Sequence, residues 1–203
     1  MRLLPALTLA LAVCTTPALA GPLHDAARAG DGALMQQLLR DGADIDERDE
    51  NGETALFAAA RAGQYSVSDQ LMVAGADSSI RDNSGMTVLH AAALAGLAGV
   101  VGTFIGEDYR TIRVDMDEHE NDLGVTALYL AAEVGHANIV AYLAFNGADT
   151  EIADRKGLTA LTRAGQLGQD EVVTILLRLG SACQDIDPAW KAECDKRKAA
   201  LGK

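Results

Sequence analysis

The chain has 203 residues, with 17 basic and 29 acidic side chains and a formal net charge of −12. An acidic surface repels phosphate groups, so this charge argues against nucleic-acid binding and against anionic lipid surfaces. Solubility alone is enough to explain the negative charge. The charge is compatible with a basic partner but is not evidence for one.

Residues 1–20 have the pattern of a secretory signal peptide. Arg2 is followed by residues 3–13, which are nearly all Leu, Ala and Val, and Ala18-Leu19-Ala20 is a small-x-small cleavage pattern. The run is shorter than the about 20 apolar residues that a membrane-spanning helix needs. We therefore expect cleavage after Ala20 and a periplasmic bacterial protein.

An alternative reading of the same segment is a lipid anchor on Cys14, because Leu-Ala-Val-Cys is similar to a lipobox. Val13 departs from the small residue that such signals place before the cysteine, so the cleaved signal peptide is preferred. No later segment is apolar over enough residues to cross a membrane. We expect no membrane insertion once the signal is removed.

A twelve-residue pattern recurs along the chain. It reads GETALFAAARAG from Gly52, GMTVLHAAALAG from Gly85, GVTALYLAAEVG from Gly124 and GLTALTRAGQLG from Gly157, with a shortened PLHDAARAG from Pro22. Successive full copies begin 33, 39 and 33 residues apart. Repeats of this period indicate a stacked solenoid, in which each unit buries its apolar face against its neighbours.

Each copy predicts a pair of helices and a hairpin. The expected inner helices are 55–62, 88–95, 127–134 and 160–167; each follows a threonine that can cap it and ends at a glycine. A second helix follows, most clearly from Asp170, where apolar residues recur at helical spacing. Another glycine then leads through a polar turn into the next copy, as a hairpin finger would.

These parts resemble the ankyrin repeat, whose landmarks are T-P-L-H-x-A-A and G-A-D. The resemblance implies an all-α solenoid of about five stacked repeats. The expected repeats are 22–48, 49–81, 82–120, 121–153 and 154–182, within a repeat domain 21–182. The family's histidine is present as His90 and His24 and is replaced by Phe57, Tyr129 and Thr162. Because that histidine joins neighbouring repeats in the family, we expect weaker coupling where it is missing.

The third repeat departs most from the pattern. Its 39-residue step implies an enlarged loop at about 106–120, and the candidate metal ligands of the chain gather there. They are Asp115, Asp117, Glu118, His119, Glu120 and Asp122. The comparison with an EF-hand fails, because Glu120 stands where glycine is needed and Thr126 where glutamate is needed. A solvated acidic loop is the preferred interpretation, a weak divalent-cation site is the alternative, and no metal is expected.

The C-terminal segment 183–203 contains two cysteines that predict a disulfide. An even pair in an exported chain reads as one bridge, here Cys183 to Cys194. The alternatives are two unpaired thiols or, less favoured, a zinc site. We expect a disulfide-tethered helical cap over the end of the solenoid, with Trp190 packed inward. The basic residues of the cap are expected to face solvent.

The resemblance also suggests where a partner would bind. In ankyrin proteins, contacts come from the finger tips and from exposed positions of the inner helices. Carried over by register, the candidate partner-binding residues are Glu53, Met86, Leu94, Leu123, Val125, Val134, Arg155, Lys156, Leu158 and Leu167. They become more apolar toward the C-terminus, as an interaction patch would. The alternative is that neighbouring fingers or the C-terminal segment cover them.

These features predict a non-catalytic protein-binding module of the bacterial envelope, monomeric when free and without a cofactor. The partner would lie on the concave face of repeats 3–5. Two alternatives are an immunity protein that neutralises a toxic enzyme and an accessory factor for an envelope or oxidative-stress enzyme. An enzyme is disfavoured, because the sequence has no nucleophile elbow and no glycine loop that would cradle phosphate.

Overall fold

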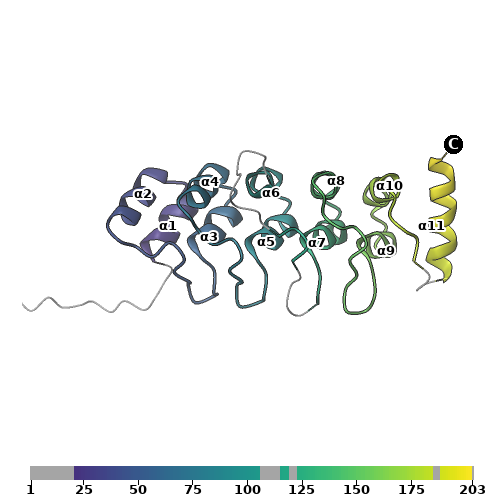
Figure 1. Cartoon of the computed structure of the whole chain (residues 1–203), viewed down its shortest axis with the longest axis horizontal. Helices are drawn as coiled ribbons and strands as arrows, with labels where there is room; N and C mark the ends of the chain where they lie inside the picture. Colours follow the sequence, from purple (N-terminus) through teal and green to yellow (C-terminus); the bar gives the residue numbers. More distant parts are fainter. Residues whose placement is uncertain (1–20, 106–114, 119–122, 185–187, 203) are drawn as a thin grey trace, which may run out of the picture.

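The computed structural model describes residues 21–105, 115–118, 123–184 and 188–202, and these form an elongated helical solenoid (Figure 1). The helices are α1 (Pro22–Ala29), α2 (Gly32–Arg40), α3 (Ala55–Arg61), α4 (Tyr65–Val73), α5 (Val88–Leu94), α6 (Ala98–Ile105), α7 (Ala127–Val134), α8 (Ala137–Phe145), α9 (Ala160–Gln166), α10 (Asp170–Arg178) and α11 (Pro188–Leu201). Within the described ranges no strand forms, apart from an isolated bridge between Ala153 and Thr159.

The helices α1 to α10 lie in two parallel rows. The inner row is α1, α3, α5, α7 and α9, and the outer row is α2, α4, α6, α8 and α10, with each helix packed against the next one in its row. Hairpin fingers leave the inner row on one side (Figure 1). This arrangement confirms the predicted all-α solenoid of five helix pairs.

The inner helices lie close together because many of their buried residues are alanine. Ala59, Ala93 and Ala131 are completely buried, and a methyl side chain lets neighbouring backbones approach. A threonine stands at the N-cap of α3, α5, α7 and α9, as predicted. The Oγ1 of Thr126 accepts a hydrogen bond from the Tyr129 amide at 3.2 Å, whereas Thr54 makes no such bond. The short alanine side chains set the distance between neighbouring inner helices, and the threonine caps set where these helices begin.

The glycines that end the inner helices serve two purposes, as Gly96 shows. Its φ of 75° lies in the left-handed region that other residues avoid. A Cβ at this position would also lie 2.7 Å from the ring of His136 in the next repeat. The His136 ring lies there because its Nε2 is hydrogen-bonded to the Leu94 carbonyl, at a distance of 3.2 Å.

The position of the family's histidine joins each repeat to the next finger. The Nε2 of His24 lies 3.0 Å from the Glu53 carbonyl, and that of His90 lies 3.2 Å from the Val125 carbonyl. At two of the positions where histidine is missing, a hydroxyl group bonds a side chain of the segment that follows the repeat. Tyr129 donates to Asp154 at 2.9 Å, and Thr162 donates to the side chain of Gln184 at 3.0 Å. The replacements therefore keep a hydrogen bond at two of the three positions.

Burial sets the chemistry of the Tyr129 hydroxyl. Removal from water, and the hydrogen bond that it donates to Asp154, raise the pKa of Tyr129 well above its ordinary value. The hydroxyl therefore stays protonated and acts as a structural donor.

The acidic residues of the third repeat build a normal finger. Asp115 accepts a hydrogen bond from the amide of Asp117 at 3.0 Å, as Asp44 does from Asp46. Asp117 in turn accepts from the Asp149 amide of the next repeat at 2.8 Å. The expected loop at 106–120 is therefore corrected for Asp115 and Asp117, which make the hydrogen bonds of a regular finger.

Part of the predicted insert lies outside the described residues. Residues 106–114 lie outside the described residues, as do His119, Glu120 and Asp122 of the candidate cation cluster. Glu118 is described and accepts a hydrogen bond from Arg81 of the preceding finger at 2.5 Å. The described acids of this segment thus hold neighbouring fingers together.

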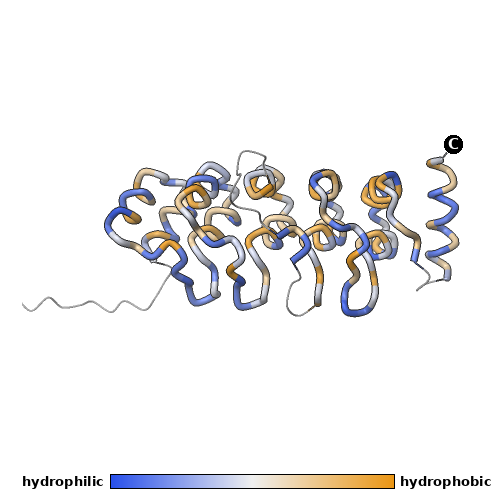
Figure 2. Tube along the Cα trace, in the orientation of Figure 1, coloured by the Kyte–Doolittle hydropathy of each residue, from blue (hydrophilic) through white to orange (hydrophobic). Residues whose placement is uncertain are grey.

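A separate helix, α11, stands across the end of the last repeat and packs against α9 and α10. The predicted disulfide between Cys183 and Cys194 is formed. Trp190 faces inward as predicted and is only 8% exposed. Figure 2 shows that hydrophobic segments run along the solenoid helices, whereas hydrophilic stretches alternate with hydrophobic ones along α11. The charged residues of α11 are partly or fully exposed. The cap therefore presents a polar outer surface, as the end of a solenoid requires.

Candidate protein-binding surface

Three large apolar side chains are exposed at the ends of consecutive inner helices. Leu94 ends α5, Val134 ends α7 and Leu167 follows α9, with exposed fractions of 37%, 46% and 46%. Val134 and Leu167 each directly precede a glycine, and Leu94 stands one residue earlier in its repeat. Because α7 packs between α5 and α9, the three residues mark the C-terminal ends of adjacent inner helices in repeats 3–5. We call them the inner-helix row. Ala62 continues it as a small exposed residue in the second repeat.

A second predicted column does not form an apolar surface. Val125 is only 2% exposed, and Glu53, Met86 and Leu158 are partly buried. These residues stand at the base of the fingers, where their carbonyls accept hydrogen bonds from finger amides or from the histidine of the preceding repeat. The Asp82 amide, for example, donates to the Met86 carbonyl at 2.9 Å. The expected exposure of Val125 is therefore wrong.

The burial of Val125 gives a direct test. Val125→Glu would place a charge in the core beside the His90 hydrogen bond, and we expect it to destabilise the fold by more than about 3 kcal/mol. The matched change Leu123→Glu, at a neighbouring residue that is 55% exposed, should alter stability by less than about 0.5 kcal/mol. Urea denaturation followed by circular dichroism measures both. Equal effects would contradict the placement of Val125.

Charged residues near the inner-helix row pair with one another. Arg163 of α9 donates two hydrogen bonds to Glu133 of α7, and Arg61 lies 2.9 Å from the carboxylate of Glu53. Burial raises the pKa of Glu53, although Arg61 opposes the change. The Arg163–Glu133 pair connects the fifth repeat to the fourth, and the Arg61–Glu53 pair lies within the second repeat. Both pairs leave the apolar side chains as the main feature that a partner would contact.

The finger tips add one apolar and two basic side chains at the C-terminal end of this surface. Leu123 is 55% exposed, and its carbonyl accepts a hydrogen bond from the Arg155 amide at 3.1 Å. Arg155 and Lys156 are both exposed at the tip of the next finger. The structure thus brings Leu123 beside Arg155, as the repeat register predicted.

Sequence reasoning missed a set of exposed apolar residues on the outer helices. Tyr65, Val73 and Phe145 are 63%, 69% and 77% exposed. A groove of about 430 Å³ lies between α2 and α4, lined by residues that include Met35, Leu39, Asp69 and Val73. Helical periodicity in α4 and α8 could have flagged these residues. The groove itself depends on how two helices from different repeats sit beside each other.

The described part of the chain offers no sign of a metal centre or a membrane span. No group of three or more His, Cys, Asp or Glu side chains among the described residues could hold a metal ion. No described helix is both long and apolar enough to cross a bilayer.

Comparison with known proteins agrees with the geometry. A family model described as ankyrin repeats (3 copies) matches residues 23–112 and, in a second and overlapping match, residues 101–187. A search of curated proteins gave no significant match. The two family matches together span nearly all of the helix pairs described above. The chain therefore belongs to the ankyrin-repeat family.

Proposed function

We propose that this protein is a non-catalytic binding module of a bacterial envelope, which holds a protein partner against the inner-helix row of repeats 3–5. Ankyrin repeats are generic protein–protein interaction modules, and this family assignment supports the general function. The finer assignment rests on the row itself.

The observation that carries the proposal is the exposure of Leu94, Val134 and Leu167 at the ends of adjacent inner helices. Soluble monomers rarely leave contiguous apolar surface uncovered unless it is used for binding. The neighbouring charges of Glu133 and Arg163 are already paired within the protein. A partner would therefore gain most from an apolar ridge of its own, with acidic groups placed near Arg155 and Lys156.

The location in the envelope is supported by two features of the sequence. Residues 1–20 have the composition of a signal peptide. The bridge between Cys183 and Cys194 is of a kind that persists in oxidising compartments. An exported chain would meet its partner in the periplasm.

Affinity capture tests the proposal. The chain from residue 21 onward serves as bait for a periplasmic extract, and captured proteins are identified by mass spectrometry. A second bait carries Leu94→Glu, Val134→Glu and Leu167→Glu. We expect one protein to be captured by the unchanged bait and lost with the variant. A protein retained by both baits would contradict the proposed face, and a catalytic turnover of that protein by the chain would contradict a purely binding role.

The identity of the captured protein would also decide between the narrower roles. A toxic enzyme, inhibited on binding, would make the chain an immunity protein. A housekeeping enzyme whose activity depends on the chain would make it an accessory factor.

A further inference from the structure

The contact of α11 with the solenoid depends on few side chains. Of the 14 residues of α11, only Trp190 and Cys194 are buried. Both belong to the core cluster that includes the apolar residues of α9 and α10. The rest of the helix lies at the surface, so these two side chains, one turn apart, carry most of the apolar contact.

Trp190 fits into a notch that the last repeat provides. The notch is at Gly165 of α9, where a Cβ would lie only 2.1 Å from the indole ring. The equivalent residues of earlier repeats are Ala60, Ala93 and Ala132, all completely buried against the next repeat. The indole of α11 thus takes the place that a further repeat would occupy.

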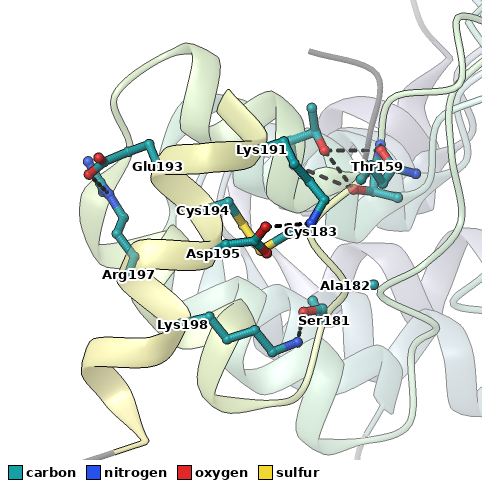
Figure 3. The surroundings of a disulfide bond; sticks show 12 residues. Thr159, Ser181, Ala182, Cys183, Lys191, Glu193, Cys194, Asp195, Arg197 and Lys198 are labelled. Carbon is teal, nitrogen blue, oxygen red and sulfur yellow. Dashed lines mark hydrogen bonds and ion pairs between the residues drawn. A yellow bond between two sulfur atoms is a disulfide. The ribbon is translucent and has the colours of Figure 1, made fainter. Parts of the chain in front are cut away.

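The polar contacts of α11 lie at the surface. Arg197 pairs with Asp170 of α10 at 2.5 Å and also with Glu193, while its guanidinium lies 6.0 Å from the centre of the Trp190 ring. Lys198 donates to the Ser181 carbonyl at 3.0 Å, as Figure 3 shows. Exposed ion pairs contribute little to stability. The expectation that the basic residues of the cap simply face solvent is therefore corrected for Arg197.

The disulfide ties this weakly held helix to the repeat. Cys183 follows α10 and is partly exposed, whereas Cys194 is completely buried under α11 (Figure 3). Because Cys194 is completely buried, an external thiolate would have to reach the bridge at Cys183, which is partly exposed and packs against the core with its other side. Reduction would remove the covalent constraint and leave Trp190 with a few surface contacts to keep α11 in place.

We propose that the Cys183–Cys194 bridge is a redox switch that controls docking of α11. The thiolate of a dithiol oxidoreductase attacks Sγ of Cys183, the disulfide breaks, and its electron pair passes to Sγ of Cys194, which takes up a proton. The second thiol of the reductant then attacks the mixed disulfide and releases Cys183 as a thiol, so the reductant leaves as a disulfide. Reduced α11 undocks and uncovers Gly165 and the end of repeat 5, while repeats 1–5 stay folded.

The single tryptophan of the chain makes this testable, because Trp190 lies in the cap. The full chain is measured before and after treatment with dithiothreitol, with thiol titration confirming that two new thiols form. We expect the emission maximum of Trp190 to move to longer wavelength and its quenching by acrylamide to increase several-fold. Helical circular dichroism should fall only by the share that α11 contributes. Emission intensity is not used, because the nearby disulfide itself quenches indole fluorescence.

Two variants complete the test. Cys183→Ser with Cys194→Ser should show the released state without reductant and no response to dithiothreitol. Gly165→Leu should expose Trp190 even in the oxidised chain, since it fills the notch while leaving the disulfide intact. If reduction leaves acrylamide quenching unchanged, or if Trp190 is exposed only when the whole solenoid unfolds, the bridge is purely structural and the proposed switch is wrong.

Discussion

Gly165→Ala should destabilise the folded chain by about 1–3 kcal/mol, the usual cost of forcing an extra methyl group into a packed site. The new Cβ would lie 2.1 Å from the Trp190 ring, and the indole cannot yield without leaving its notch. Urea denaturation followed by circular dichroism gives the change in the free energy of unfolding. Trp190 emission, recorded in the same titration, reports whether the cap has moved before the repeats unfold.

When the indole is absent, Gly165→Ala should raise the free energy of unfolding instead of lowering it. In a Trp190→Ala background the notch is empty, so alanine at position 165 meets no obstacle. It should then stabilise the helix by up to about 1 kcal/mol through its better helix propensity. Ala60, Ala93 and Ala132 show that this position of the repeat accepts alanine without strain. Additive effects of the two substitutions would mean that Trp190 and Gly165 do not interact.

The elements that the sequence predicted well are those specified by local signals. A capping threonine and a terminating glycine enclose each inner helix, so the expected range 127–134 matches α7 and the others differ from the structure only at the last residue. The disulfide was also predictable, because only two cysteines follow residue 20. Such features need no knowledge of neighbouring repeats.

The errors concern features that depend on packing between repeats. The position of Val125 reads as an exposed finger residue in the family register, but its carbonyl lies at the finger base beside His90 and its side chain enters the core. The sequence pattern places Asp115 and Asp117 in an insert, but their hydrogen bonds are those of a regular finger. The contact between Gly165 and Trp190 joins residues 25 apart and has no local sequence signal.

A triple charge substitution on the inner-helix row should weaken partner binding at least about 100-fold, since a charge placed in an apolar interface without a partner is costly to bury. The variant is Leu94→Glu, Val134→Glu and Leu167→Glu. Because all three side chains are well exposed, each change should alter the free energy of unfolding by less than about 0.5 kcal/mol. Calorimetric titration with the captured partner, and a urea denaturation curve, measure the two quantities separately.

A matched control lies on the opposite row of helices. Val73→Glu, Phe145→Glu and Leu179→Glu add the same charge at three exposed apolar residues of the outer row, so nonspecific repulsion by an already acidic protein affects both variants alike. Loss of binding in the inner variant alone would locate the interface on the inner-helix row. Loss in the outer variant alone would move it to the outer helices. Salt measures how much Arg155 and Lys156 add to the apolar contact. Binding held mainly by the inner-helix row should weaken only modestly between low and physiological salt, whereas binding held mainly by Arg155 and Lys156 would weaken strongly.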